Sequence, residues 1–107
     1  MTAPVADELT SVIVVAADSG ALLQACVDAV LVSVVPVELI LVDNASTDGQ
    51  VERAASRHAH DPRLRVLHND ANLGFGPACN RGTAQARGDV FVFLNPDCIG
   101  DAHTIED

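Results

Sequence analysis

The residue whose type and position best suit metal chemistry is Asp97, which comes shortly after an apolar run at residues 90–94. A carboxylate at the end of a buried strand is a hard oxygen ligand for Mg²⁺ or Mn²⁺, and Asn95 would add an amide oxygen. Such a cation would bridge the two phosphates of a nucleotide and stabilise a leaving diphosphate. Taken alone, Asn95-Pro96-Asp97 also fits a simple turn that Pro96 stiffens.

A second candidate pair, Asp43 and Asn44, follows the apolar run at residues 37–42. The carboxylate of Asp43 would accept a hydrogen bond from a base N–H or from a ribose hydroxyl. The alternative is a strand-to-helix turn, because Asn44 and residues 46–48 are all good helix-capping types. The pair by itself leaves both interpretations open.

Two further segments place small or polar residues next to apolar runs. Ala16, Ala17 and Asp18 close the first run, and Asn72 and Gly74 belong to a loop before a helix. Glycine lets the backbone approach a ligand, and a helix N-terminus favours phosphate. The loop matches neither the GxGxxG fingerprint nor a Walker A loop, so a plain turn remains the alternative.

Seven elements must position these residues. Short β-branched runs predict strands, and apolar residues at helical spacing predict helices between them. We expect strands at residues 11–16, 37–42, 63–68 and 90–94, and helices at residues 21–32, 49–58 and 77–87. This alternation favours a three-layer, Rossmann-like α/β fold, with a parallel sheet and helices on both faces. The carboxyl ends of the four strands then meet at one rim, where such sheets bind ligands.

The ends of the elements carry their own signals. Thr47 or Asp48 would cap the second helix, Pro77 fits the first turn of the third helix, and Gly88 fits its C-terminal end. Residues 1–10 predict a flexible N-terminal tail, and residues 11–107 predict one domain.

The net charge and the composition limit the classes of molecule that the chain can bind. The 107 residues carry a net charge of −9, which repels nucleic acid and anionic membranes. A nucleoside diphosphate would also be repelled unless a cation or backbone N–H groups compensate. No apolar run approaches the roughly 20 residues of a membrane span, and no signal peptide is visible. Three widely spaced cysteines predict reduced, buried thiols. We therefore expect a cytoplasmic chain, compatible with a place at the inner face of the membrane through a parent protein or a partner.

Four segments, read together, resemble family 2 glycosyltransferases of the GT-A fold, especially the rhamnosyltransferase-like branch. In order they are SVIVVAADSG at residues 11–20, VELILVDNASTDG at 37–49, NLGFGPACNRG at 72–82 and VFVFLNPD at 90–97. The second is close to the family's Val-Asp-Asn-Ala-Ser-Thr-Asp-Gly signature. The fourth looks like the strand that bears the DxD-type motif, here in an Asn-Pro-Asp form. Together the four matches favour a ligand role for Asp43 and Asp97 over the turn interpretation.

The resemblance implies an inverting transfer of a sugar, possibly rhamnose, from a UDP- or dTDP-linked donor to a glycan or lipid-linked acceptor. The resemblance also implies Mg²⁺ or Mn²⁺ as cofactor, held by Asp97, and a role in cell wall or polysaccharide biosynthesis. By position, the nucleotide would be held by Ala16, Ala17, Asp18, Asp43, Asn44, Asn72, Gly74 and Asn95.

Two departures from the family pattern matter. The family's Tyr after the first strand is Ala17 here, and the neighbouring Asn is Asp18, so base stacking is lost and a second carboxylate enters the nucleoside pocket. The family's catalytic Asp and acceptor-binding strands lie downstream of the metal motif. The resemblance therefore assigns no catalytic residue here and implies the N-terminal, donor-binding half of an enzyme, inactive as a fragment. The alternative is a non-catalytic assembly or regulatory module that forms a homodimer through an exposed sheet edge.

Overall fold

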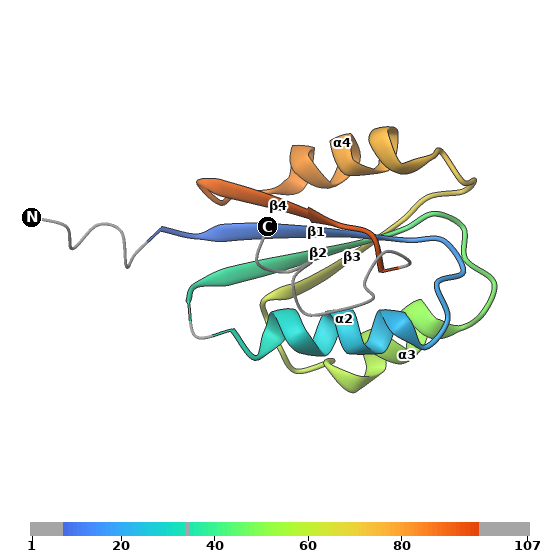
Figure 1. Ribbon diagram of the computed structural model, residues 1–107, viewed down its shortest axis with the longest axis horizontal. Helices are drawn as coiled ribbons and strands as arrows, with labels where there is room; N and C mark the ends of the chain where they lie inside the picture. Colours follow the sequence, from blue (N-terminus) through green and yellow to red (C-terminus); the bar gives the residue numbers. More distant parts are fainter. Residues whose placement is uncertain (1–7, 34, 97–107) are drawn as a thin grey trace, which may run out of the picture.

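Four parallel strands form the centre of the structure, a computed structural model that describes residues 8–33 and 35–96 (Figure 1). The strands are β1 (Thr10–Ala16), β2 (Val37–Asp43), β3 (Leu64–His68) and β4 (Val90–Leu94). Their order across the sheet is β3-β2-β1-β4, and every pairing is parallel. Because β1 and β2 are central, nearly all their residues are buried, whereas the edge strands β3 and β4 are more exposed.

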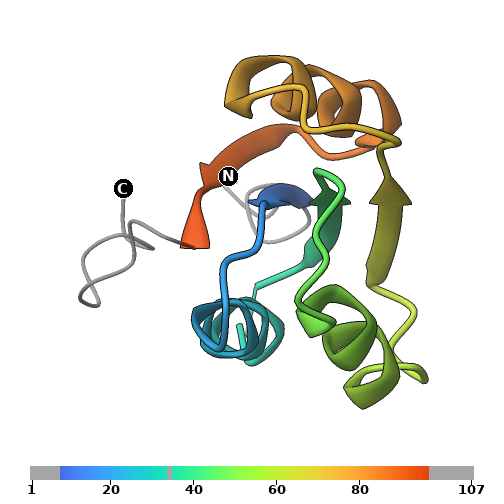
Figure 2. The same ribbon diagram turned by 90° about the vertical axis from the view of Figure 1, so that its right-hand side faces the viewer.

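Three helices cover the two faces of this sheet (Figure 2). They are α2 (Leu22–Leu31), α3 (Gln50–Arg57) and α4 (Phe75–Gln85). Both α2 and α3 lie on one face, and α4 lies alone on the other. The predicted three-layer α/β fold with helices on both faces is confirmed.

The alternation of side chains along each strand divides the core in two. Val12 and Val14 of β1 pack with α2 in the larger cluster, together with Leu39 and Leu41 of β2. The residues between them on both strands point the other way and pack against α4 in the smaller cluster. The strands are apolar on both sides because each face meets a helix, as expected for a parallel sheet.

The helix α4 differs from its predicted bounds at both ends. The helix begins at Phe75 and ends at Gln85, two residues earlier than predicted in each case, so that Pro77 is its third residue. Gly88 was predicted to end this helix, but Ala86 is the C-terminal cap. Gly88 instead lies against β1, where an added Cβ would come within 2.6 Å of the carbonyl oxygen of Leu9. Its role is close backbone approach rather than capping.

Two smaller boundaries also differ. The predicted side-chain cap of α3 is wrong for Thr47, because Gly49 is the N-cap residue and no side chain caps it. Asp48 still accepts a hydrogen bond from the backbone N–H of Gln50, at 3.1 Å. The strand β1 already begins at Thr10, inside the segment predicted as tail, and the rest of that segment up to residue 7 lies outside the described residues.

Candidate functional site

Asp43 ends β2 at the centre of the rim formed by the carboxyl ends of the strands. Its side chain is almost fully buried, although His68 beside it on the rim is exposed. Its Oδ1 accepts a hydrogen bond from the backbone N–H of Ser46 at 2.8 Å, and its Oδ2 lies 3.0 Å from Nδ1 of His68. The register of β2 and β3 pairs Asp43 directly with His68, so the sheet itself fixes this contact. The side chain of His68 is 58% exposed, so the imidazole that contacts the buried carboxylate reaches solvent.

Asp18 joins the first strand end to the second. Its Oδ1 accepts hydrogen bonds from the backbone N–H groups of Thr47 at 2.7 Å and Asp48 at 3.1 Å. In return, the hydroxyl of Ser46 accepts from the backbone N–H of Asp18 at 3.0 Å. Asp18 has a positive φ of 51°, which Asp tolerates better than most residues. Its carboxylate, predicted as a ligand group, thus holds the loop after β2 in place.

Asn44 ties the second strand end to the loop after β3. Its Nδ2 donates to the carbonyl of Gly74 at 3.1 Å, and its Oδ1 accepts from Nδ2 of Asn69 at 2.8 Å. The same Oδ1 accepts from the backbone N–H of Leu73 at 3.3 Å. Asn44 is buried and has partners on both sides of its amide. The structure therefore gives Asn44 an organising role beneath the rim.

The loop at residues 70–74 is exposed along its whole length, as are the first three residues of α4 after it. Asn72 is bonded within it, since its Oδ1 accepts from the backbone N–H of Gly74 at 2.8 Å. Gly74 has a φ of 84°, a conformation that favours glycine. Behind the loop, Arg81 of α4 donates to the carbonyl of His68 at 2.6 Å and to the side chain of Asn69. A guanidinium is thereby fixed at the rim, beside the pair formed by Asp43 and His68.

The remaining predicted residues lie at the ends of β1 and β4. Ala16 is buried in β1, and Ala17 follows it half-buried, with its backbone N–H donating to Ser19 Oγ at 3.3 Å. Asn95 is half-buried after β4 and has partners of its own. Asp97, the predicted metal ligand, lies outside the described residues, so its role stays a prediction.

Two residues that the sequence interpretation did not select join Asp43 at the rim. Asp43, Glu52 and His68 each offer one potential ligand atom, and these atoms all lie within 4.8 Å of one another. The three come from β2, α3 and β3, and both Glu52 and His68 are exposed. His68 lies beside Asp43 because β3 pairs with β2, so the strand order is the signal for it. Glu52 lies in the first turn of α3, where an acidic residue is common because it interacts favourably with the helix dipole, so its type and position give no specific signal of a site.

This group of three has a donor set that suits a divalent cation. Carboxylate oxygen is a ligand for Mg²⁺ and Mn²⁺, and imidazole nitrogen is accepted by the later metals of the series. A tetrahedral or octahedral ion would draw the three atoms closer than 4.8 Å, and the exposed side chains of Glu52 and His68 can move to allow it. The residues present therefore fit a metal at this rim.

Among residues 8–33 and 35–96, no helix has the length and apolar character needed to cross a membrane. Among the histidines that the structure describes, His58 also has an ion pair, but it lies away from the rim, with its Nε2 2.8 Å from Oδ1 of Asp28. The two described cysteines, Cys26 and Cys79, are free and buried, as predicted. Burial raises the pKa of the Cys26 thiol to about 11, which keeps it protonated and unreactive.

Comparison with known proteins gives the site a context. Residues 11–107 match the family model described as glycosyl transferase family 2. The chain is 35% identical over 100 residues to the glycosyltransferase GlyG of Streptococcus pneumoniae. The matched region covers 92% of this chain and 33% of GlyG. The chain is also 48% identical over 50 residues to an N-acetylglucosaminyl-diphospho-decaprenol L-rhamnosyltransferase of Mycobacterium tuberculosis, covering 47% of this chain and 15% of that protein.

Solved structures give the same picture. TarS of S. aureus in complex with UDP-GlcNAc superposes with a TM-score of 0.74 at 25% identity, covering 82% of this chain and 26% of that one. The mannosyltransferase PcManGT of Pyrobaculum calidifontis, in complex with GDP-Man and Mn²⁺, gives 0.73 at 29% identity, covering 82% and 27%. The chain thus spans about a third or less of the length of these proteins.

Proposed function

The chain belongs to glycosyl transferase family 2, and from that premise we propose that its rim binds the nucleoside diphosphate part of a nucleotide sugar. The observation that carries the proposal is Asp43, a buried carboxylate at the end of a central strand that opens onto solvent through His68. Ligands of open α/β sheets bind at this end of the strands. Related structures hold UDP-GlcNAc, UDP and GDP-Man, which supports a nucleotide sugar as the ligand.

In this proposal the described residues divide the work between binding and support. Asp43 accepts hydrogen bonds from the nucleoside, while Asp18 and Asn44 hold the loops on either side of it. Ala16, Ala17, Asn72, Gly74 and Asn95 complete the nucleotide-binding set proposed from the sequence. Arg81, fixed at the rim by the carbonyl of His68, supplies positive charge near the phosphates.

A divalent cation is part of the proposal because the chain carries a net charge of −9 and a diphosphate adds more negative charge. The residue that would hold it next to the phosphates is Asp97, and the group Asp43, Glu52 and His68 at the rim is a second candidate site for a cation. When bound, Mg²⁺ or Mn²⁺ neutralises the diphosphate and favours its departure. The complex of PcManGT with GDP-Man and Mn²⁺ supports this choice of cofactor.

The finer parts of the proposal concern the whole enzyme. We propose UDP or dTDP as the nucleotide, rhamnose as a candidate sugar, and a glycan or lipid-linked molecule as the acceptor. The similarity to an L-rhamnosyltransferase over 50 residues supports the sugar. The cytoplasmic location and the inactivity of these residues as a donor-binding half remain predictions from the sequence.

The proposal is tested by calorimetric titration of the 107-residue chain with UDP and with dTDP, in MnCl₂ and in EDTA. We expect binding that requires the metal and that is lost in Asp97→Ala. The matched control is Asp89→Ala, which removes an exposed carboxylate at the opposite end of β4 and should leave binding intact. A folded sample, checked by circular dichroism, that binds neither nucleotide with Mn²⁺ would refute the proposal.

A second candidate function, a non-catalytic assembly module, is favoured by one specific observation. The edge strand β4 exposes three large apolar residues, as an interface would. This candidate predicts a stable homodimer whether or not nucleotide binds, and the same titration would then show no metal-dependent binding.

A further inference from the structure

Consecutive backbone N–H groups hold the turn that leads from α4 into β4 against the start of β1. The N–H of Gly88 donates to the hydroxyl of Ser11 at 2.8 Å. The N–H groups of Asp89 and Val90 both donate to the carbonyl of Leu9, at 2.7 Å and 3.4 Å. The point at which β4 begins is therefore tied to particular atoms of β1 and of the residue before it.

Both partners of the hydrogen bond between Gly88 and Ser11 are fitted to each other. Ser11 is fully buried, and its hydroxyl hydrogen goes to Oε2 of Glu38 at 2.6 Å, so its oxygen is left to accept from Gly88. A Cβ added to Gly88 would come within 2.9 Å of the backbone nitrogen of Ser11. A side chain at this position would therefore push the turn away from β1.

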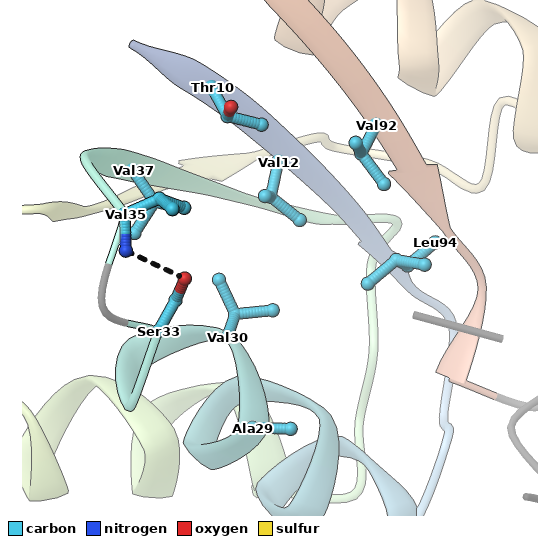
Figure 3. A pocket seen from close by; sticks show the side chains of 9 residues that line it. All are labelled: Thr10, Val12, Ala29, Val30, Ser33, Val35, Val37, Val92 and Leu94. Carbon is cyan, nitrogen blue, oxygen red and sulfur yellow. Dashed lines mark hydrogen bonds between the residues drawn. The ribbon is translucent and has the colours of Figure 1, made fainter. Parts of the chain in front are cut away.

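The side chains of β4 do not specify where it pairs along β1. Its first four residues, VFVF, repeat with a period of two, so a slip of two residues keeps every valine and phenylalanine on its own face of the sheet. In the observed register Val92 pairs with Val12. Figure 3 shows Val92 and Leu94 beside Val12, along a groove of about 290 Å³ between the sheet and α2. This groove has room for Leu94 in the place of Val92, so packing on this side also tolerates the slip.

The register of β4 matters because the residues that follow it carry proposed ligand groups. Asn95 comes directly after Leu94, the last residue of the strand, and Asp97 is two residues further along the chain. A strand rises about 3.3 Å per residue, so a slip of two residues would move Asn95 by about 7 Å along the sheet. Asp43, which ends β2, would stay where it is, and the two sides of the rim would no longer match.

We propose that Ser11 and Gly88 are positioning residues that set the register of β4 and thereby place Asn95 and Asp97 at the rim. Neither acts on a ligand directly, because Ser11 lies near the start of β1 and the rim lies at its end. The inference rests on the proposed function, since this placement matters only if the rim binds a nucleotide sugar. The register itself can be tested without a ligand.

The test compares two variants of the 107-residue chain, labelled with ¹⁵N and ¹³C. Ser11→Ala removes the acceptor of the Gly88 N–H. Glu38→Gln is the matched control, because it changes the partner of Ser11 in the same buried cluster but keeps the hydroxyl of Ser11 and an oxygen that accepts from it. Nuclear Overhauser effects between backbone protons of β1 and β4 report which residues are paired. Calorimetric titration with UDP in MnCl₂ reports the affinity.

We expect the wild-type chain and Glu38→Gln to show one set of cross-strand signals, with Val12 beside Val92. Ser11→Ala should show a second set, with Val12 beside Val90 or Leu94, and its dissociation constant for UDP should rise at least about fivefold. A purely structural role of Ser11 would lower the stability of both variants and leave the pairing and the affinity unchanged.

A second variant, Gly88→Ala, reaches the same turn without altering β1. It keeps the hydrogen bond between Ser11 and Glu38, and its methyl group displaces the turn, so it should shift both the pairing and the affinity even if Ser11→Ala does not fold. Native pairing in every variant that folds would overturn the proposal, and shifted pairing with unchanged affinity would overturn the positioning role. A wild-type chain that binds no nucleotide with Mn²⁺ would refute the proposed function instead, and the cross-strand signals would still decide whether Ser11 and Gly88 set the register.

Discussion

The strand β2 carries two buried carboxylates, Glu38 near its start and Asp43 at its end, and their surroundings differ. Glu38 is 5% exposed and Asp43 is 4% exposed. Glu38 Oε2 accepts from the hydroxyl of Ser11 at 2.6 Å and from the backbone N–H of Arg87 at 2.5 Å. The guanidinium of Arg87 lies 3.7 Å from the other oxygen. The protein itself thus supplies donors and positive charge to Glu38.

Asp43 has a different set of partners, one on each carboxylate oxygen, whereas both hydrogen bonds of Glu38 go to Oε2. A single backbone N–H and an exposed imidazole contact its carboxylate, and a second carboxylate, Glu52, lies nearby. Both acids are equally buried, so burial alone does not distinguish a structural group from a ligand-binding one. The difference lies in the groups that contact each carboxylate. At Glu38 they include a buried hydroxyl and a backbone N–H that are fixed by the fold, whereas at Asp43 one of the two partners is an exposed side chain beside which a ligand can bind.

The largest expected effect is a loss of stability in Glu38→Gln. The amide keeps the size of the side chain but removes the negative charge that the Ser11 hydroxyl and the Arg87 N–H donate to. We expect the free energy of unfolding to fall by about 2 kcal/mol, as for a lost hydrogen bond to a charged group. Urea denaturation measures it, and nucleotide binding at the far end of β2 should be unchanged below the melting transition. If the free energy of unfolding falls no further in Glu38→Gln than in Asp43→Asn, the proposed difference between the two carboxylates is wrong.

The same variant should change the pH dependence of stability. Burial acts to raise the pKa of Glu38, but the hydrogen bonds from Arg87 and Ser11 outweigh it and hold the pKa below its usual value. The unfolded chain therefore binds the proton more readily than the folded chain, and stability falls as the pH drops from about 4.5 through the folded pKa. Wild type should lose its advantage over Glu38→Gln in this acid range. An advantage that stays constant from neutral pH to pH 3 would contradict the assignment.

The matched variant at the other end of β2, Asp43→Asn, should weaken nucleotide binding more than it lowers stability. The amide oxygen still accepts from the N–H of Ser46, so the free energy of unfolding should fall by less than about 1 kcal/mol. We expect UDP binding in the presence of Mn²⁺ to weaken about tenfold, equivalent to about 1.4 kcal/mol. Calorimetric titration checks this, with Glu38→Gln as the control. Unchanged affinity in a folded sample would remove Asp43 from the site.

The contrast also shows what the sequence does and does not predict. The apolar runs predicted all four strands and hence the rim that gathers Asp18, Asp43 and His68. The run VELILV did not predict the hydrogen bonds of Glu38, because its partners Ser11 and Arg87 lie 27 and 49 residues away in the sequence. Such contacts depend on the register of neighbouring strands and on where the chain returns after α4, which local patterns do not encode.

The bounds of α4 and the hydrogen bonds of Asn44 could not be predicted from the sequence, for related reasons. Glycines around Phe75 predicted a loop, but the structure extends the helix back to Phe75, since Pro77 is tolerated within its first turn. Asn44 has the residue type of a ligand and the position of one. Only the loop that folds back over it, through Leu73 and Gly74, shows that its amide is occupied.

The smallest expected effect concerns Glu52, the exposed carboxylate that makes the surroundings of Asp43 acidic. If Asp43, Glu52 and His68 hold a cation, Glu52→Gln removes one exposed ligand charge and should weaken Mn²⁺ binding about threefold, since exposed charges contribute under about 1 kcal/mol. The signal of free Mn²⁺ in electron paramagnetic resonance measures the affinity directly, without nucleotide. Glu8→Gln is the control, because it removes an exposed carboxylate before β1, away from the rim. If Glu52→Gln and Glu8→Gln bind Mn²⁺ with equal affinity, Asp43 has no metal beside it and acts only as a hydrogen-bonding group. The contrast between Asp43 and Glu38 would then depend only on their access to solvent.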